Sequence, residues 1–370
     1  MDPVITRIDM ALIEGKRPRA AGSNARLGYH GDSVRLPVMR LTTADGAVGF
    51  GRCATGEEHL RPLLGKPVSE LVAGGRVRAG WTLYELPLLD LAARLAGQPV
   101  YAFAGGERPR VQSYDTSLYF DDLHLADDAT AADLIAGEAR DGWDRGHRAF
   151  KIKVGRGARH MPLEAGTVRD TAIIKAVREA VGPEATVVID ANNGWNLNLT
   201  KRVLSETADA NLYWVEEAFH EDNVLYADLK EWLTTEGLAV RIADGEGSAH
   251  PSLADWAREG LVDVVQYNIF GYGFDRWRQL GSELDGLGAQ SSPHTYGGGV
   301  SAYVTAHLAG VTGAVKFVEW DFAEVAEIDA SAWTIRDGWI EVPDASGFGL
   351  ELDHRAFDAA VARNGFTLRQ

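Results

Sequence analysis

Residues 149–154 read AFKIKV, residues 185–192 read ATVVIDAN and residues 212–217 read LYWVEE, and these stretches decide the fold. Each is a short apolar, β-branched run that reaches a charged side chain, the pattern of a buried strand in a parallel sheet. The segments between them, notably 167–181 and 201–208, have helical spacing of their apolar residues. Strands that alternate with helices predict an α/β fold with parallel strands and crossover helices.

The same pattern continues to both sides and predicts eight strands. They are expected at 110–119, 149–154, 185–190, 212–216, 239–244, 262–268, 288–292 and 315–320. Eight such strands indicate a closed barrel, which keeps its chemistry at the carboxyl ends of the strands. Seven of the runs reach a chemically capable residue there, at intervals of roughly 22 to 37 residues. These are Lys153, Asp190, Glu216, Glu246, Asn268, His294 and Glu319.

The chain before residue 110 has a different pattern. Residues 4–52 are strand-like, with a hairpin turn at Asp45-Gly46. Residues 14–32 lack periodicity and are expected to form a loop, either an ordinary solvated loop or a lid over a ligand. Residues 87–96 have helical spacing, and Gly105 to Pro109 reads as a linker, so the first domain boundary falls near residue 110. The tail beyond 340 mixes a strand with a short helix and is expected to return to the first domain.

Composition limits the possible partners. A chain of 370 residues exceeds the usual size of a single core, which favours one large domain with a smaller companion. A net charge of -16 opposes binding to nucleic acid or to an anionic membrane. Cys53 is the only cysteine, so no intrachain disulfide forms, and neither a signal core nor a membrane-spanning run is present. We expect a cytoplasmic protein with a small-molecule ligand.

Three of the strand-end residues, Asp190, Glu216 and Glu246, are carboxylates. Side by side they would repel each other, and a hard divalent cation such as Mg²⁺, one per site, relieves that repulsion. Two positions have an alternative nearby: Glu246 is favoured, with Asp244 two residues before it in reserve, and Glu217 is adjacent to Glu216. On a strand of period two, only one of two neighbouring side chains points inward.

Two strand ends carry groups that transfer protons. Lys151 and Lys153 alternate onto one face, where like charge and a nearby Mg²⁺ are expected to lower the lysine pKa toward that of a base. The alternative is a solvent-facing pair. His294 precedes the glycine run Gly297 to Gly299, which lets the backbone approach a ligand, here a substrate or a phosphate group.

Together, KIK at 151–153, VVIDAN at 187–192, WVEE at 214–217, the Gly-Glu at 245–246, PHTYGGG at 293–299 and VEW at 318–320 resemble the enolase superfamily, mandelate racemase subgroup. The segment ELPLLDLAARLAGQPVYAFAGG at 85–106 resembles the end of that family's capping domain, so the resemblance covers nearly the whole chain.

The resemblance implies a modified TIM barrel, (β/α)7β, at 111–340. It also implies an α+β capping domain built from 1–110 and the C-terminal segment 341–370, with substrate-selecting loops near 14–32 and 53–59, and a homo-oligomer. Mg²⁺ on Asp190, Glu216 and Glu246 binds a substrate carboxylate while a base removes the adjacent proton. By the same resemblance Lys153, assisted by Lys151, and His294 act as acid and base, and Glu319 binds the substrate carboxylate. Further substrate contacts are expected from Asn192, Tyr29, His30, Arg17 and Tyr296.

Two positions depart from the family pattern. Asn268 stands where an aspartate usually pairs with the histidine, and Ala218 stands where proline is common. An amide orients an imidazole but does not stabilise its protonated form as a carboxylate does.

Asn268 therefore counts against two-base racemisation, and three hypotheses are considered. The first is a Mg²⁺-dependent dehydratase that converts a sugar acid (an aldonate or aldarate) to a 2-keto-3-deoxy acid. The second is an epimerase, racemase or lactone cycloisomerase that uses the same enolate chemistry. The third is a family member that has lost turnover and only binds.

Overall fold

The structure is a computed structural model that describes residues 2–370, and one of its two main sheets is antiparallel. Its strands are β1 (Ile5–Ala21), β2 (Gly31–Thr43), β3 (Val48–Arg52), β14 (Glu324–Val325) and β19 (Phe366–Arg369). The order is β14-β1-β2-β3, and β19 pairs with β1. The hairpin predicted at Asp45-Gly46 joins β2 to β3 and is confirmed, with Gly46 at a φ of 88° that favours glycine.

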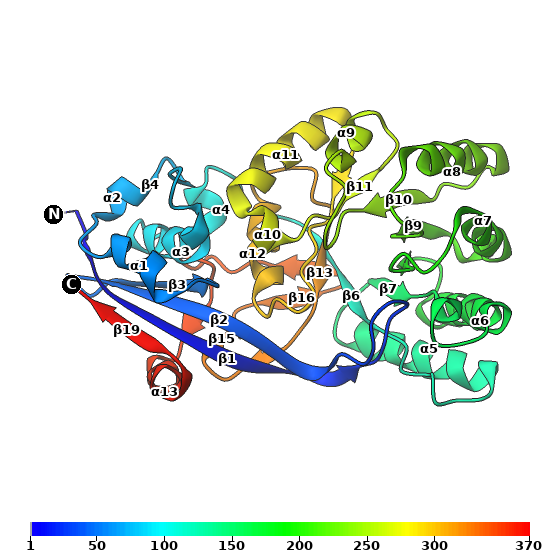
Figure 1. Cartoon of the computed structure of the whole chain (residues 1–370), viewed down its shortest axis with the longest axis horizontal. Helices are drawn as coiled ribbons and strands as arrows, with labels where there is room; N and C mark the ends of the chain where they lie inside the picture. Colours follow the sequence, from blue (N-terminus) through cyan, green and yellow to red (C-terminus); the bar gives the residue numbers. More distant parts are fainter. Residues whose placement is uncertain (1) are drawn as a thin grey trace.

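Helices α1 (Glu57–Leu60), α2 (Val68–Leu71), α3 (Glu85–Leu95) and α4 (Val100–Phe103) pack beside this sheet (Figure 1). The strands β4 (Val72–Ala73) and β5 (Arg76–Val77) form a small hairpin between them. The predicted helix at 87–96 is α3, and Pro87 lies in its first turn, where no backbone hydrogen bond is lost. A Cβ on Gly49 of β3 would lie 2.4 Å from the backbone of Leu91, so glycine allows α3 to pack closely on the strand.

A parallel sheet follows, and all eight predicted strands are present in it. They are β6 (Gln112–Leu118), β7 (Ala149–Lys153), β8 (Thr186–Asp190), β9 (Leu212–Glu216), β10 (Arg241–Asp244), β11 (Val264–Val265), β12 (Gln290–Ser291) and β13 (Phe317–Trp320). Neighbours in the chain are neighbours in the sheet from β6 to β12, and β13 pairs with β6. An isolated parallel bridge also joins Ser291 of β12 to Val315.

Helices connect these strands and lie outside the sheet (Figure 1). They are α5 (Asp128–Asp144), α6 (Leu163–Val181), α7 (Leu197–Glu206), α8 (Asn223–Glu236), α9 (Leu253–Arg258), α10 (Ile269–Tyr272), α11 (Phe274–Leu287) and α12 (Ser301–Leu308). The predicted helices at 167–181 and 201–208 are α6 and α7. On the inner side, a separate apolar cluster that includes Tyr114, Trp214 and Phe317 fills the space between the strands.

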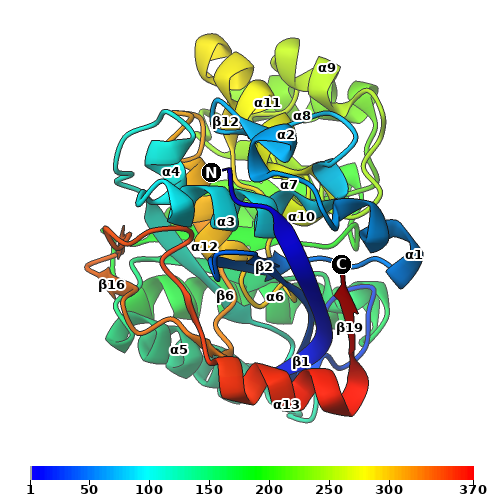
Figure 2. The same cartoon turned by 90° about the vertical axis from the view of Figure 1, so that its left-hand side faces the viewer.

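The C-terminal tail ends in a strand of the first sheet. After β15 (Ile328–Asp329), β16 (Thr334–Arg336), β17 (Trp339–Glu341) and β18 (Glu351–Leu352), helix α13 (His354–Asn364) leads into β19. Because β19 pairs with β1 in the register Arg7↔Arg369, the last residues of the chain lie beside the first half of β1 (Figures 1 and 2). Among the described residues, every helix is too short or too polar to cross a membrane.

The loop expected at 14–32 is shorter than predicted. Strand β1 continues to Ala21 and β2 begins at Gly31, so only residues 22–30 connect them. Strands β1 and β2 form a long hairpin with pairs such as Lys16↔Ser33, so the arginine-rich part of 14–32 belongs to the sheet. The connection itself reaches the parallel sheet, where the backbone N–H of Phe120 donates to the Ser23 carbonyl at 2.9 Å.

Candidate active site

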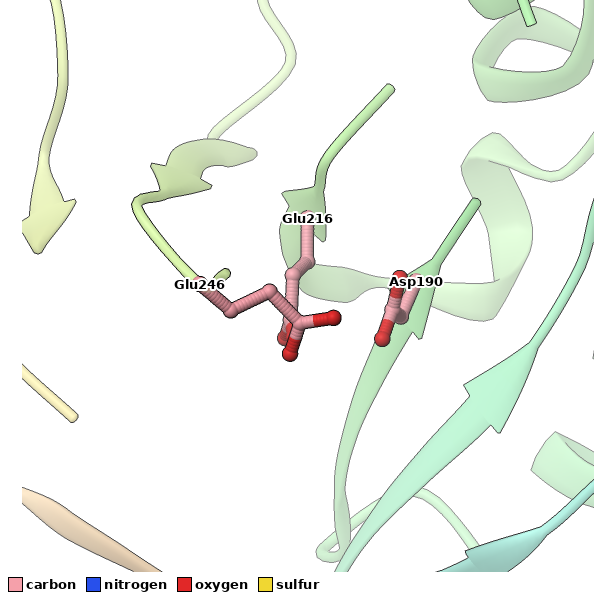
Figure 3. A group of neighbouring side chains, drawn as sticks. All are labelled: Asp190, Glu216 and Glu246. Atoms are coloured by element: carbon pink, nitrogen blue, oxygen red, sulfur yellow. The ribbon is translucent and has the colours of Figure 1, made fainter. Parts of the chain in front are cut away.

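Three carboxylates meet at the carboxyl ends of neighbouring strands (Figure 3). Asp190 ends β8, Glu216 ends β9, and Glu246 follows β10 by two residues. The parallel register pairs Asp190 with Glu216, and one oxygen from each of the three lies within 4.8 Å of the others. Asp190 and Glu216 are fully buried. Three oxygen donors at this spacing fit a hard divalent cation with room for other ligands.

The structure also decides between Glu246 and Asp244 and between Glu216 and Glu217. Asp244 accepts hydrogen bonds from the Tyr226 hydroxyl and the Gly245 N–H, both at 2.7 Å, and lies outside the carboxylate group. Glu217 has a φ of 42°, which breaks the strand alternation, and it accepts from the Asn192 amide at 3.0 Å. Glu216 and Glu246 are therefore the members of the group.

Burial makes two of the glutamates at this site costly to ionise. Burial, and then Asp190, raise the pKa of Glu216 to about 8. Burial, and then Glu246, raise the pKa of Glu217 to about 10. Such shifts mean that gathering the carboxylates in their ionised form is unfavourable, and a bound Mg²⁺ would offset the cost.

Both lysines of β7 point at this group. The Lys151 Nζ lies 2.8 Å from an oxygen of Glu216 and 2.8 Å from one of Glu319, and Lys153 forms an ion pair with Asp190. Both are buried, so the alternative of a solvent-facing pair is wrong. Burial is the largest influence on the pKa of Lys153 and lowers it, but Asp190, Glu246 and Glu216 together outweigh burial, and the net shift is upward. The expected decrease assumed a Mg²⁺ ion close by, which would compete for the same carboxylate.

His294 and Asn268 lie side by side on neighbouring connections. The Asn268 Nδ2 is 3.1 Å from His294 Nδ1, and His294 Nε2 is 3.2 Å from an oxygen of Glu246. His294 therefore reaches the carboxylate group from β12 while Lys153 reaches it from β7.

Glu319 is placed differently from what its expected role requires. One oxygen accepts from Thr116 Oγ1 and Lys151, both at 2.8 Å, and the other from the N–H groups of Thr295 at 2.6 Å and Tyr296 at 3.0 Å. A carboxylate oxygen accepts about two hydrogen bonds, so in this conformation Glu319 holds the segment after His294 in place and has no free oxygen for a substrate.

The residues expected to contact substrate lie in four different surroundings. Asn192 is central, because its amide donates to Glu217 and to Glu246, both at 3.0 Å. His30 and Tyr296 are in contact, with ring centroids 5.7 Å apart. Arg17 is engaged by Asp321, at 2.7 and 2.8 Å. Tyr29 is 71% exposed on the β1–β2 connection.

Two residues near the lysines escaped the sequence reasoning. Tyr119, just after β6, stacks on Tyr296 with centroids 5.1 Å apart, and the Lys153 Nζ lies 5.4 Å from its ring centroid. Thr116 of β6 donates to Glu319. Both lie at the carboxyl end of the first predicted barrel strand, and this position is the sequence feature that could have identified them.

A cavity of about 400 Å³ opens beside the carboxylate group. It is lined by polar side chains from the β1–β2 connection and from the ends of β8, β9 and β10, among them Asn24, Arg26, Asn192, Glu217, Glu221 and Glu246. Many hydrogen-bonding groups in one cavity suit a polyhydroxylated ligand.

Comparison with known proteins identifies the family. The family model described as enolase C-terminal domain-like matches residues 134–356. A galacturonate dehydratase from Geobacillus sp., solved with D-galacturonate and 5-keto-4-deoxy-D-galacturonate, is 44% identical, with a TM-score of 0.95 over 99% of each chain. A mandelate racemase/muconate lactonizing protein from Geobacillus sp. Y412MC10, solved with magnesium and tartrate, is 44% identical, with a TM-score of 0.96 over 100% of this chain and 98% of that one.

Arabinonate dehydratase of Saccharolobus solfataricus is 25% identical over 365 residues, which cover 88% of this chain and 90% of the relative. These likenesses confirm the resemblance and imply the same barrel-plus-cap fold, and the similar mandelate racemase/muconate lactonizing protein was solved with magnesium. The chain belongs to the enolase C-terminal domain-like family, among its mandelate racemase/muconate lactonizing members.

Proposed function

We propose that this protein is a Mg²⁺-dependent dehydratase of a hexuronate such as D-galacturonate. The observation that carries the proposal is the carboxylate group Asp190, Glu216 and Glu246 with Lys153 and His294 against it. The 44% identity to a galacturonate dehydratase over 99% of both chains supports the substrate class.

The chemistry follows from these residues. Mg²⁺, when bound, supplies the positive charge that a substrate carboxylate needs as its α-proton is lost. Lys153 takes that proton at Nζ, and Lys151 keeps Glu216 and Glu319 in place. The hydroxyl on the β-carbon then leaves as water. Since the carboxylate carbon of a hexuronate is C6, loss of the C5 proton and the C4 hydroxyl gives a 5-keto-4-deoxy product, which is a 2-keto-3-deoxy acid counted from the carboxylate.

We infer further that the eight parallel strands close into a (β/α)7β barrel at 111–340, with 1–110 and 341–370 as the cap. The bridge Ser291↔Val315 and the pairing of β19 with β1 support this division.

One observation favours a second candidate, a dicarboxylate substrate (an aldarate). Arg26 lines the cavity and has no carboxylate within 4.0 Å among residues 2–370, so its guanidinium is available to a second carboxylate at the far end of the ligand.

A panel of acids with Mg²⁺ tests both candidates. We expect a keto acid lighter than its substrate by one water, measured by mass spectrometry, from D-galacturonate, and none from galactarate, D-gluconate or D-arabinonate. Keto acid from galactarate that is lost in Arg26→Ala would favour the second candidate. Deuterium uptake from D₂O at the α-carbon with no keto acid from any substrate would contradict dehydration and favour an isomerase.

A further inference from the structure

The side-chain amide of Asn268 has a fixed orientation. Asn268 precedes α10, and its Oδ1 accepts from the N–H groups of Phe270 and Gly271, both at 3.0 Å. Only the oxygen of an amide accepts hydrogen bonds, so these two donors decide which end of the amide is which. The Nδ2 group therefore points the other way, toward His294.

This orientation determines which nitrogen of His294 carries the proton. The Asn268 NH₂ group is only a donor, and at 3.1 Å it bonds to a Nδ1 that is an acceptor. The proton of the neutral imidazole then sits on Nε2. A backbone bridge, with Ile269 N–H donating to the His294 carbonyl at 3.1 Å, keeps the two side chains in register.

We propose that Asn268 is a positioning residue that holds His294 in the Nε2–H tautomer, so that His294 offers the substrate a hydrogen-bond donor and not a base. This rests on the proposed dehydration and assigns all proton transfer at the α-carbon to Lys153. An aspartate at 268 would instead accept from a protonated Nδ1 and leave Nε2 free to take a proton.

The elimination of water needs only one proton-transfer group, Lys153. The Cα–H bond breaks and its proton moves to the Lys153 Nζ; the Cβ–O bond breaks with its electron pair on oxygen. The same ammonium returns the proton, and water leaves. The resulting enol loses its hydroxyl proton to solvent and gains one at the β-carbon, which gives the α-keto acid.

Nitrogen NMR of protein labelled with [¹⁵N]histidine tests the tautomer without any turnover, with and without Mg²⁺. The His294 signals are identified by their loss in His294→Gln. We expect a pyridine-type, unprotonated Nδ1 and a protonated Nε2 in the wild type, and the reverse in Asn268→Asp, whose carboxylate keeps the helix cap. A protonated Nδ1 in the wild type would overturn the proposal, whether or not the protein is a dehydratase.

A second measurement follows the consequence for the α-carbon. In D₂O the wild type is expected to exchange the α-proton of only one member of a pair of acids that are epimeric there. Asn268→Asp is expected to gain exchange with the other member, while Lys153→Ala loses exchange with the first. Exchange of both epimers by the wild type, or exchange that survives in Lys153→Ala, would overturn the assignment of Lys153 as the base.

Discussion

Arg17 of β1 and Asp321, immediately after β13, form a two-pronged ion pair although they lie 304 residues apart in the sequence. The Nε–Oδ1 distance is 2.7 Å and the Nη2–Oδ2 distance is 2.8 Å, and both side chains are almost fully buried. Asp321 also accepts from the N–H of Gly297 at 2.7 Å, and the guanidinium lies 4.5 Å from the Tyr296 ring centroid. The pair thus connects the N-terminal sheet to the segment that carries His294.

Breaking this pair should loosen that connection. Because removal of one partner leaves a buried charge unpaired, we expect Arg17→Ala to lower the free energy of unfolding by about 3 to 5 kcal/mol and to raise KM. Urea unfolding and steady-state kinetics measure the two effects. Arg35→Ala is the matched control, since its pair with Glu14 is exposed and should be worth less than about 1 kcal/mol. Equal losses in both variants would contradict a special role for Arg17.

Removal of one carboxylate should abolish ion binding. In Glu216→Gln an oxygen ligand with its charge is lost, so calorimetry should show no Mg²⁺ uptake at concentrations that saturate the wild type. Asp244→Asn is the control, because Asp244 is equally buried and close in sequence but bonds to Tyr226 and Gly245. If Asp244→Asn loses Mg²⁺ while Glu216→Gln keeps it, the metal site has been assigned to the wrong residues.

The two lysines of β7 should fail in different ways. Lys153→Met removes the proposed base but leaves its partner Asp190 with Lys151, 3.4 Å away, so we expect kcat to fall by about 10²- to 10⁴-fold with the smaller loss of stability. Lys151→Met instead leaves buried Glu216 and Glu319 without their shared cation, and a loss of stability of about 3 to 5 kcal/mol should accompany its loss of activity. Thermal unfolding of both variants separates the roles. A Lys153→Met protein that unfolds as early as Lys151→Met would show that Lys153, too, is mainly structural.

Acid should destabilise the fold through a buried histidine. Burial lowers the pKa of His307 to about 3, below its ordinary value of 6.5. On acidification the unfolded chain therefore takes up the proton first, and the stability due to neutral His307 is intact above about pH 6.5 and is lost as pH falls toward 3. The slope is about 1.4 kcal/mol for each pH unit in that range.

The measurement is chemical denaturation at several pH values for the wild type and His307→Gln. The difference between the two should shrink as pH falls below 6.5, because only the wild type loses this contribution, while the other titrating groups cancel. A difference in unfolding free energy that is constant from pH 7 to pH 5 would contradict the assignment of this pH dependence to His307. His147, whose pKa burial lowers to about 4, should show the same trend over a narrower range.

The sequence by itself determined the strands, their order and the rim residues. Runs such as AFKIKV and ATVVIDAN report burial on both faces of a parallel sheet, and the residue that ends each run is fixed in space once the strands are parallel. Asp190 and Glu216, each the last residue of its strand, could be predicted for that reason, whereas Glu246 lies two residues beyond β10.

Tertiary structure alone decided which of the candidate side chains belong to the site and which already bond to other residues. Glu216 and not Glu217 joins the site because Glu217 has a φ of 42°. Glu246 and not Asp244 joins it because Asp244, on β10, bonds to the hydroxyl of Tyr226 in helix α8. Likewise the partner of Arg17 lies beyond the last barrel strand. Hydrogen bonds and ion pairs between distant segments depend on distances of a few ångströms that no local pattern encodes, so the local sequence supplies candidates and the packed fold selects among them.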